Sequence, residues 1–368
     1  MMQIPMADLR AQYGALAEEI EGAVREVLQS CRFILGPNVS ALEEEIADYC
    51  EARYAVGVNS GTDALILALA ACGIGPGDEV ITTPFTFVAT VEAIVRVGAT
   101  PVFADIDPVT FNLDAARVEE RITERTRALL PVHLYGQTAD LTALGHIAAR
   151  HSLRLISDGA QAIGARHNGM GIGQFGDAAT LSFFPTKNLG GPGDGGMVLT
   201  NSEEVAERVR LLRFHGSGGT YSYREVGWCS RLDELQAAVL RVKLRHLPEW
   251  TARRAANASR YTALLEGCGL RLPQAVPGNE HVWHQYTVAT PRRSELQAFL
   301  RERGIASAVY YPGALHLEEA YRFLGGREGD LPEAERACRE VLSLPVFPEL
   351  PEGAVEHVAQ AVREFFGA

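Results

Sequence analysis

A lysine stands at the start of a glycine-rich segment, SFFPTKNLGGPGDGG, which covers residues 182–196. Five of the nine residues that follow Lys187 are glycines. Glycine lets the backbone come close to a ligand and adopt φ/ψ values that other residues avoid. The pattern is typical of a lysine that a planar ligand approaches closely. It fits equally well a loop between two strands that carries one solvated lysine.

Ser182 precedes this lysine by five residues, so one short segment offers both a hydroxyl and an amine. A hydroxyl that binds a phosphate and an amine that attacks a carbonyl suit a single ligand, a phosphorylated aldehyde. A lysine amine forms an imine when desolvation or a nearby cation lets it lose its proton near neutral pH. The segment therefore favours covalent binding of such a ligand at Lys187.

Asp158 directly follows the apolar run LRLIS at residues 153–157, and Gln161 lies three residues further on. A carboxylate at the end of a buried strand is poised inside a crevice, where it would pair with a ring nitrogen or a metal ion. The alternative is an ordinary loop aspartate. No His or Cys accompanies it at ligand spacing, and His133 and His167 form no HExxH pair, so we predict no metal site.

A turn of small residues, Ser60-Gly61-Thr62, joins the apolar run at residues 54–58 to a helical pattern. The free N–H groups of a helix start bind phosphate, although a plain N-cap by Ser60 or Thr62 explains the same residues. A phosphate cradle, a lysine and an aspartate together suit pyridoxal phosphate, because the aspartate keeps the pyridine nitrogen protonated and the ring then draws electrons. Phe87 would stack on that ring or serve equally well as a core aromatic.

The composition is that of an ordinary globular chain: 368 residues, 47% of them hydrophobic, predict about two domains. The formal net charge of −12 argues against nucleic-acid or anionic-membrane binding, since both need clustered positive charge. The six cysteines are scattered without a CxxC pair, so we expect neither a disulfide framework nor a zinc site. No apolar run is long enough to span a membrane, and the first residues do not resemble a secretory signal. We therefore expect a cytoplasmic protein.

The elements that must position these side chains alternate from residue 54 onward. Apolar runs alternate with amphipathic stretches, which predicts βαβ units and a mostly parallel sheet covered by helices on both faces. Ligands of such sheets bind at the carboxyl ends of the strands, where Asp158 and Lys187 are expected. The predicted strands are residues 54–60, 78–84, 100–107, 127–134, 153–159, 178–184 and 195–200.

Two helices are predicted before this sheet. Residues 13–30 carry apolar side chains at helical spacing. Ser40 and Glu43 have the spacing of a capping box, which predicts that the second helix begins at Ser40.

The C-terminal part of the chain predicts a second, smaller unit. A long helix that begins at residue 231 and runs towards residue 265 links a large domain, residues 1–245, to a small C-terminal α/β domain, residues 246–368. The strands expected in the small domain are residues 283–290 and 306–312.

Motifs along the whole chain resemble the DegT-type nucleotide-sugar aminotransferases, a fold-type I pyridoxal-phosphate family. SGTDAL is weak on its own, whereas the lysine segment with its GDGG, at the family's spacing from DGAQA, is highly specific. The resemblance implies the fold-type I architecture, with a large sheet domain between helices and a smaller α/β domain. The matching pieces are FILGPNVSALEEEIA, NSGTDAL, PGDEVITTPFTFVAT, PVFADIDPVTFNLD, PVHLYGQTADL, DGAQAIGA, LSFFPTKNLGGPGDGGMVLT, RLDELQAAVL and YYPGALHL.

The resemblance also implies a role for each candidate residue. Lys187 would form the Schiff base and then act as general acid–base, Asp158 would pair with the pyridinium nitrogen, and Gln161 would lie beside the ring hydroxyl. The phosphate and the ring face would be held by Gly61, Thr62, Ser182 and Phe87. A branch of the family that dehydrates sugars has histidine in place of the lysine, so Lys187 argues for transamination.

The chain departs from the family pattern at residues 227–231. Cys229 stands where relatives carry an asparagine that reaches the cofactor phosphate from the neighbouring subunit, and a thiol is a poor hydrogen-bond donor. Arg231 matches a residue near the active site across the dimer interface, where its charge would hold an anionic substrate. The alternative is a helix-start arginine paired with Asp233 or Glu234.

A second departure is Tyr310-Tyr311-Pro312, which stands where relatives have His-Tyr-Pro and puts a sugar-side contact in doubt. Tyr311 itself is a candidate substrate-binding residue. His316 matches a histidine near the nucleotide phosphates. A partly buried structural histidine is the alternative for His316.

These residues and the resemblance together predict a homodimeric aminotransferase with an active site shared across the interface. It would move an amino group from an amino acid, by resemblance L-glutamate, to the keto group of a UDP- or dTDP-linked sugar, preferably a 3-keto sugar, in the biosynthesis of an amino sugar for a surface polysaccharide or a glycosylated metabolite. The alternatives are 4-keto transamination, sugar dehydration, a non-catalytic nucleotide-sugar-binding or regulatory protein, and a nucleotide-binding protein without pyridoxal phosphate.

Overall fold

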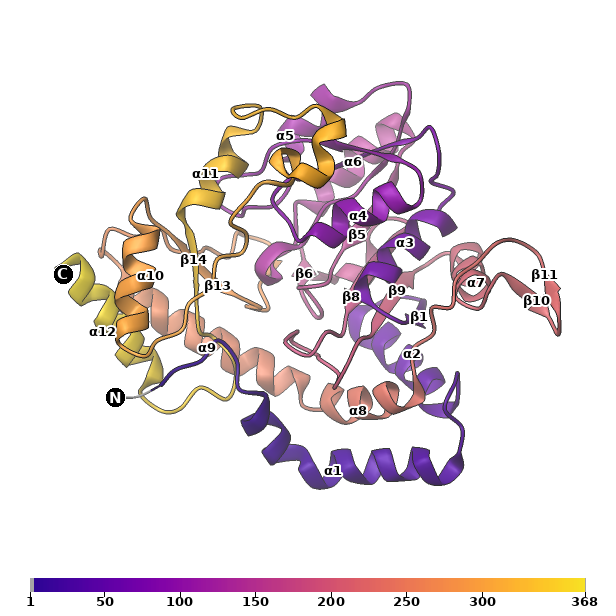
Figure 1. The fold of residues 1–368 in the computed structure, drawn as a ribbon, viewed down its shortest axis with the longest axis horizontal. Helices are drawn as coiled ribbons and strands as arrows, with labels where there is room; N and C mark the ends of the chain where they lie inside the picture. Colours follow the sequence, from indigo (N-terminus) through magenta and orange to yellow (C-terminus); the bar gives the residue numbers. More distant parts are fainter. Residues whose placement is uncertain (1–2, 368) are drawn as a thin grey trace.

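The computed structural model describes residues 3–367 and is built around a seven-stranded sheet. The strand order is β1-β9-β8-β5-β4-β2-β3 (Figure 1). Neighbouring strands from β3 to β8 are parallel, and only β9 runs antiparallel to its neighbours β1 and β8. The predicted mostly parallel sheet is therefore confirmed. Its strands are β1 (Tyr54–Val58), β2 (Glu79–Thr82), β3 (Thr100–Phe103), β4 (Thr126–Leu129), β5 (Arg154–Asp158), β8 (Ala178–Ser182) and β9 (Gly196–Thr200).

Helices cover both faces of this sheet because its strands carry apolar side chains on both sides. On β9, Met197 and Leu199 pack with the cluster of α1, α2 and α8, whereas Val198 packs with the cluster of α3, α4 and α7. Helix α8 lies against both α1 and α2 (Figure 1). The helices around the sheet, on both faces together, are α1 (Leu9–Ser30), α2 (Pro37–Cys50), α3 (Gly61–Ala71), α4 (Val88–Arg96), α5 (Ala115–Val118), α6 (Leu141–His151), α7 (Glu203–Leu212) and α8 (Glu234–Leu244).

The start of helix α2 corrects the predicted capping box. The helix begins at Pro37, ahead of Ser40, and no side chain of its own caps it. The Glu234 carboxylate of α8 accepts hydrogen bonds from the backbone N–H groups of Gly36, Asn38 and Val39. A partner distant in sequence therefore satisfies these donors, which a local pattern cannot reveal.

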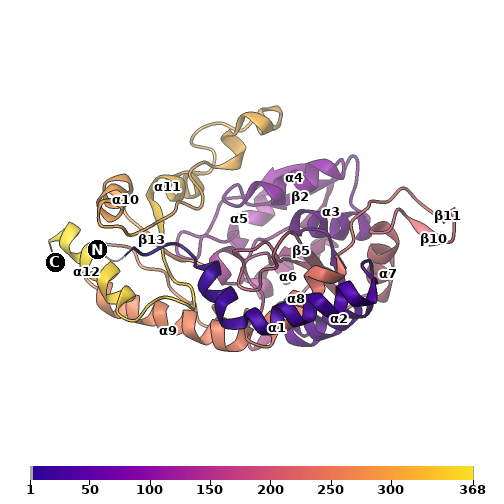
Figure 2. The same cartoon turned by 60° about the horizontal axis from the view of Figure 1, so that its bottom comes forward.

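The C-terminal elements pack around a cluster of their own, at the left of Figures 1 and 2. Ile4, near the start of the chain, joins this cluster and pairs with Ile305. The elements of this cluster are α9 (Leu247–Leu265), β13 (Tyr286–Ala289), α10 (Arg293–Glu302), β14 (Val341–Leu344) and α12 (Ala354–Phe366). Helix α11 (Pro332–Glu340) instead packs in a cluster with Phe85 and Phe111. The boundary between residues 245 and 246 stays a prediction.

Two expectations for this part of the chain are wrong. The single long helix from residue 231 is two helices, α8 and α9, because Pro248 in the first turn of α9 has no N–H to continue the helix from α8. Residues 306–312 form no strand apart from one bridge between Ala308 and Ser343. The Tyr310 carbonyl instead accepts a hydrogen bond from the Tyr135 hydroxyl, so this segment binds the loop after β4 rather than a neighbouring strand.

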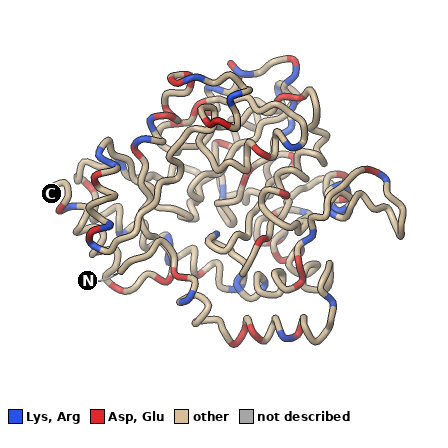
Figure 3. The backbone as a smooth tube through the Cα atoms, in the orientation of Figure 1, with Lys and Arg blue, Asp and Glu red and all other residues tan. Residues whose placement is uncertain are grey.

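Short elements complete the described chain. A hairpin of β10 (Ser217–Gly219) and β11 (Ser222–Tyr223) projects from the body of the molecule in both views (Figures 1 and 2). Charged residues of both signs are interspersed along the described backbone (Figure 3). Among residues 3–367, no helix is both long and apolar enough to cross a membrane. The remaining elements are β6 (Arg166–His167), β7 (Met170–Gly171), β12 (Asn279–Glu280), η1 (Glu119–Arg121), η2 (Leu134–Gly136), η3 (Ile172–Gln174), η4 (Leu315–Leu317) and η5 (Glu319–Leu324).

Candidate active site

A cavity of about 470 Å³ lies at the carboxyl ends of the parallel strands. Its walls come from the turns after β1, β2 and β8, from the end of β5, and from the segment at residues 310–311. The cavity brings together eight residues that the sequence nominated: Gly61, Thr62, Phe87, Asp158, Gln161, Ser182, Lys187 and Tyr311. It does not include Cys229, Arg231 or His316.

Lys187 lies in a tight turn that follows β8. Its backbone N–H donates to the Phe184 carbonyl at 2.9 Å. The chain passes so close to itself here that a Cβ on Gly190 would lie 2.3 Å from the Pro185 carbonyl oxygen, which explains one of the glycines. Burial lowers the pKa of the Lys187 amine to about 8, although the Asp158 carboxylate raises it. A buried amine that loses its proton near neutral pH is suited to attack a carbonyl.

Asp158 is the last residue of β5, and its side chain is buried. One carboxylate oxygen accepts from the Ala160 N–H at 3.1 Å, and the other accepts from the Thr90 hydroxyl at 2.7 Å. Burial raises the pKa of the Asp158 carboxyl, whereas both hydrogen bonds and the positive charge of Lys187 lower it. The Lys187 amine and the Asp158 carboxylate thus line the same cavity, and each affects the pKa of the other.

The turn between β1 and α3 both caps the helix and lines the cavity, so its two interpretations are compatible. Ser60 caps α3 by accepting from the Asp63 N–H at 3.1 Å, while Gly61 and Thr62 line the cavity. A Cβ on Gly61 would lie 2.7 Å from the Cβ of Ser182, so only glycine lets the helix start lie against the end of β8. The first turn of α3 and the Ser182 hydroxyl therefore form one cradle that suits a phosphate.

Gln161, Tyr311 and Phe87 line the cavity beside these groups. The Gln161 side-chain oxygen accepts from the Tyr135 N–H at 2.7 Å, and its amide donates to the Tyr311 hydroxyl at 3.1 Å. Phe87 is 55% exposed, and its ring centroid lies 6.2 Å from that of Tyr311. An aromatic ring that faces a cavity is not a core residue, so Phe87 is free to stack on a planar ligand.

Two polar residues that the sequence did not indicate lie close to Asp158 and Lys187. Thr90 binds Asp158, and His284 lines the cavity near Lys187. The Nδ1 atom of His284 lies 3.0 Å from the Asn188 side-chain oxygen, and burial together with the positive charges of Lys187 and Arg254 lowers the pKa of His284 well below its ordinary value. The imidazole is therefore neutral. His284 lies almost 100 residues from Lys187 in the sequence, so no local pattern links the two.

Cys229 and Arg231 lie beside each other outside this cavity, close to the projecting hairpin. A guanidinium nitrogen of Arg231 lies 2.9 Å from the Cys229 sulfur, and the guanidinium carbon lies 5.0 Å from the ring centroid of Phe214. Within residues 3–367 Arg231 makes no ion pair with Asp233 or Glu234, the alternative considered above.

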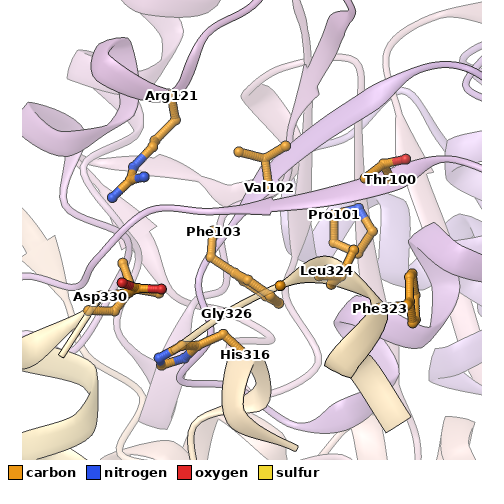
Figure 4. Close-up of a pocket in the computed structure, with 12 residues that line it drawn as sticks. Thr100, Pro101, Val102, Phe103, Arg121, His316, Phe323, Leu324, Gly326 and Asp330 are labelled. Atoms are coloured by element: carbon orange, nitrogen blue, oxygen red, sulfur yellow. The ribbon is translucent and has the colours of Figure 1, made fainter. Parts of the chain in front are cut away.

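His316 lines a second cavity of about 590 Å³ between β3 and η5 (Figure 4). Its Nε2 atom lies 3.2 Å from a Glu335 carboxylate oxygen, and its ring packs against Phe103. Arg121 and Asp330 line the same cavity (Figure 4). The described structure thus separates His316 from the cavity of Lys187 and buries it, as the structural alternative requires.

Residues 15–363 match the model of the DegT/DnrJ/EryC1/StrS aminotransferase family. The chain belongs to this family. It is 54% identical to a pleiotropic regulatory protein of Geobacillus stearothermophilus, over 99% of both chains. It is 49% identical to the dTDP-3-amino-3,4,6-trideoxy-α-D-glucose transaminase of Streptomyces venezuelae, over 99% of this chain and 96% of the relative. It is 47% identical to the UDP-N-acetyl-3-dehydro-α-D-glucosamine 3-aminotransferase of Acidithiobacillus ferrooxidans, over 98% of this chain and 97% of the relative.

Solved structures of family members superpose along the entire chain. The crystal structure of S. venezuelae DesV in complex with a ketimine intermediate has a TM-score of 0.98 at 48% identity, with complete coverage of both chains. The structure of NtdA from Bacillus subtilis with bound cofactor PMP has a TM-score of 0.93 at 30% identity, covering 100% of this chain and 86% of the other. The predicted fold class and family are therefore confirmed.

Proposed function

We propose that this protein is a pyridoxal-phosphate-dependent aminotransferase that moves an amino group from L-glutamate to the keto group of a nucleotide-linked 3-keto sugar. The observation that carries the proposal is that Lys187, whose pKa is lowered by burial, and the buried Asp158 carboxylate line one cavity and interact electrostatically. The names of two relatives support the substrate class: one is a dTDP-3-amino sugar transaminase, and the other is a 3-aminotransferase of a UDP-linked 3-dehydro sugar. The pathway is then the biosynthesis of an amino sugar.

The residues that line the cavity fit the cofactor. Asp158 is placed to hold a proton on the pyridine nitrogen, and Lys187 to bind the aldehyde carbon. The first turn of α3 and Ser182 offer donors to the phosphate without a side chain at Gly61 to obstruct it. The exposed ring of Phe87 offers a stacking surface. When bound, the cofactor supplies an electron sink and carries the amino group between the two substrates.

The chain's own residues then have defined tasks. Once the substrate amine has replaced it, the Lys187 amine stays beside the reacting carbons, takes a proton from one of them and returns it to the other. A pKa of about 8 lets this amine do both near neutral pH. The Asp158 carboxylate holds the proton on the ring nitrogen. The turn at Gly190 and the walls of the cavity exclude water from the amine.

A second copy of the chain would complete the site. The hairpin region carries exposed apolar side chains, among them Tyr221 at 90% and Val226 at 93% exposure, and such surfaces mark association. In the proposed homodimer this region places Cys229 and Arg231 of one protomer at the cavity of the other. Arg231 would hold an anionic substrate group, and the weak donor Cys229 would leave the phosphate to the α3 turn and Ser182.

A non-catalytic regulatory role is the second candidate, because one relative is named a pleiotropic regulatory protein. That role would not need a reactive lysine. This chain retains Lys187, Asp158 and the cavity between them, which favours catalysis. The cytoplasmic location stays a prediction.

The test separates the two half-reactions. Purified protein loaded with pyridoxal phosphate is mixed with L-glutamate alone, and we expect about one equivalent of 2-oxoglutarate per site, as for a ping-pong enzyme. A panel of UDP- and dTDP-linked 3-keto and 4-keto sugars then identifies the acceptor by mass spectrometry and NMR. Protein that bound the cofactor but released no keto acid from any amino acid would contradict the proposal.

A further inference from the structure

Three buried side chains form a continuous hydrogen-bonded line that ends on Asp158. The Thr90 hydroxyl donates to Asp158 Oδ2 at 2.7 Å, and the Thr86 and Thr90 hydroxyl oxygens lie 2.8 Å apart. Both threonines are almost fully buried; Thr86 precedes helix α4, and Thr90 lies in its first turn. Thr86 lines the cavity of Lys187 whereas Thr90 does not, so Asp158 and Thr86 are the described side-chain partners of the Thr90 hydroxyl.

With Asp158 ionised, the line runs in one direction. An ionised carboxylate only accepts, so Thr90 donates to Asp158 and Thr86 donates to Thr90. If Asp158 were protonated and donated to Thr90, the Thr90 hydroxyl would turn to Thr86, and the Thr86 hydroxyl would have to donate into the cavity that it lines. The threonine pair therefore favours the ionised form of Asp158, against the burial that favours its neutral form.

We infer that Thr90, supported by Thr86, is a positioning residue that keeps the Asp158 carboxylate ionised and fixed in orientation toward the cofactor nitrogen. The inference rests on the proposed function for the identity of the ligand, but not for the state of the carboxylate. Thr90 itself does not line the cavity. It acts on the reaction through Asp158 alone.

The charged and titratable groups that face Asp158 come from two other elements. Lys187 lies in the turn after β8, and its positive charge lowers the pKa of Asp158. Tyr311 lies on the segment after residue 305, and its own pKa is raised by burial and by the charge of Asp158. Both groups are unchanged in the variants below, so a difference between variants reports the threonines.

The first experiment needs no cofactor. Protein freed of cofactor is labelled with ¹³C-aspartate, and the Asp158 carboxyl signal is assigned by its loss in Asp158→Asn. In Thr90→Val, which keeps the shape but removes the hydroxyl, we expect Asp158 to bind its proton about tenfold to hundredfold more tightly, so that its titration moves to higher pH. Thr90→Ser restores the donor and the original titration.

The second experiment measures the affinity of the same proteins for pyridoxal phosphate by equilibrium dialysis. We expect Thr90→Val to bind about tenfold more weakly, Thr90→Ser to stay within about threefold of the wild type, and Thr86→Val to show a smaller loss in the same direction. The matched control is Thr82→Val, since Thr82 is equally buried but donates to the Leu130 carbonyl. It should alter neither readout.

An unchanged Asp158 titration together with cofactor affinity within twofold of the wild type in Thr90→Val would overturn the inference. A wild-type protein that does not bind pyridoxal phosphate would overturn the proposed function instead, and the titration would still decide the role of Thr90. Should Thr90→Val fail to fold, as circular dichroism would show, Thr86→Val tests the same direction: an unshifted titration in that variant would count against the inference.

Discussion

The chain contains two lysines, Lys187 and Lys243, and the contrast between them shows what makes one reactive. Burial lowers the pKa of both Lys187 and Lys243 to about 8. Lys243, on helix α8, is buried and donates to the Gly190 carbonyl at 2.7 Å. Lys187 instead lines a cavity and faces the Asp158 carboxylate. A lowered pKa alone therefore does not identify a catalytic lysine.

The two lysines nevertheless serve the same segment. Gly190, which accepts from Lys243, lies three residues after Lys187 in the same tight turn. Lys243 thus stabilises, through the Gly190 carbonyl, the turn that contains Lys187. Lys187 is therefore assigned a chemical role and Lys243 a structural one. Each of the following variants tests either the reactive site around Lys187 or the structural role of Lys243.

The largest effect is expected for Lys187→Ala. Removal of the amine takes away both the covalent attachment and the proton transfer between the reacting carbons, so amino transfer should fall by more than about a thousandfold. The measurement is kcat with L-glutamate and the best keto sugar, at a melting temperature close to that of the wild type. Full amino transfer by this variant would contradict the assignment.

Asp158→Asn should have the next largest effect. The amide keeps the shape of the carboxylate but has no charge to hold a proton on the ring nitrogen, so kcat should fall about a hundredfold to a thousandfold. The absorption spectrum of the bound cofactor should change in the same variant. A kcat within fivefold of the wild type would show that Asp158 does not serve the ring.

Phe87→Ala should weaken cofactor binding by about tenfold, because one face of the ring loses its stacking partner. Phe323→Ala is the matched control, since Phe323 is 67% exposed but lines the second cavity. Affinity is measured by dialysis of pyridoxal phosphate against each variant. Equal losses in both variants would argue against stacking by Phe87.

The smallest effect on catalysis is expected for Lys243→Met, with kcat within about threefold of the wild type. Its stability should fall by about 1–2 kcal/mol at pH 9, because the Gly190 carbonyl loses its donor. Since the folded pKa of Lys243 is lowered to about 8 from 10.5, the unfolded chain keeps the proton longer than the folded one as pH rises. The advantage of the wild type over the variant should therefore grow between about pH 8 and pH 10.5. Urea unfolding of cofactor-free protein measures this difference in unfolding free energy. A difference that shrinks between about pH 8 and pH 10.5 would contradict the structural role of Lys243.

Alternating apolar runs were sufficient to predict the sheet, and residues at strand ends were sufficient to predict most of the cavity wall. Asp158 and Ser182 were visible because each ends or directly follows such a run, and Lys187 because it starts a glycine-rich segment. Thr90 and His284 were not, because a buried threonine in a helix and a histidine in a strand-like segment are ordinary residues until the fold brings them to Asp158 and Lys187.

The errors have the same physical origin. The start of α2 depends on Glu234, almost 200 residues away, and no local pattern contains that partner. The sequence analysis did not single out Lys243, because an amphipathic helix can bury a lysine stem without any signal in its spacing. His316 lines the second cavity, and its role near the nucleotide phosphates stays a prediction. Long-range contacts decide these positions.

Reduction with borohydride tests the contrast between the two lysines most directly. The protein loaded with pyridoxal phosphate is reduced, digested and mapped by mass spectrometry. The account predicts loss of the yellow colour and cofactor mass on the peptide that contains Lys187, with none on the peptide that contains Lys243. Cofactor mass on Lys243, or a loaded protein with no labelled lysine at all, would contradict it.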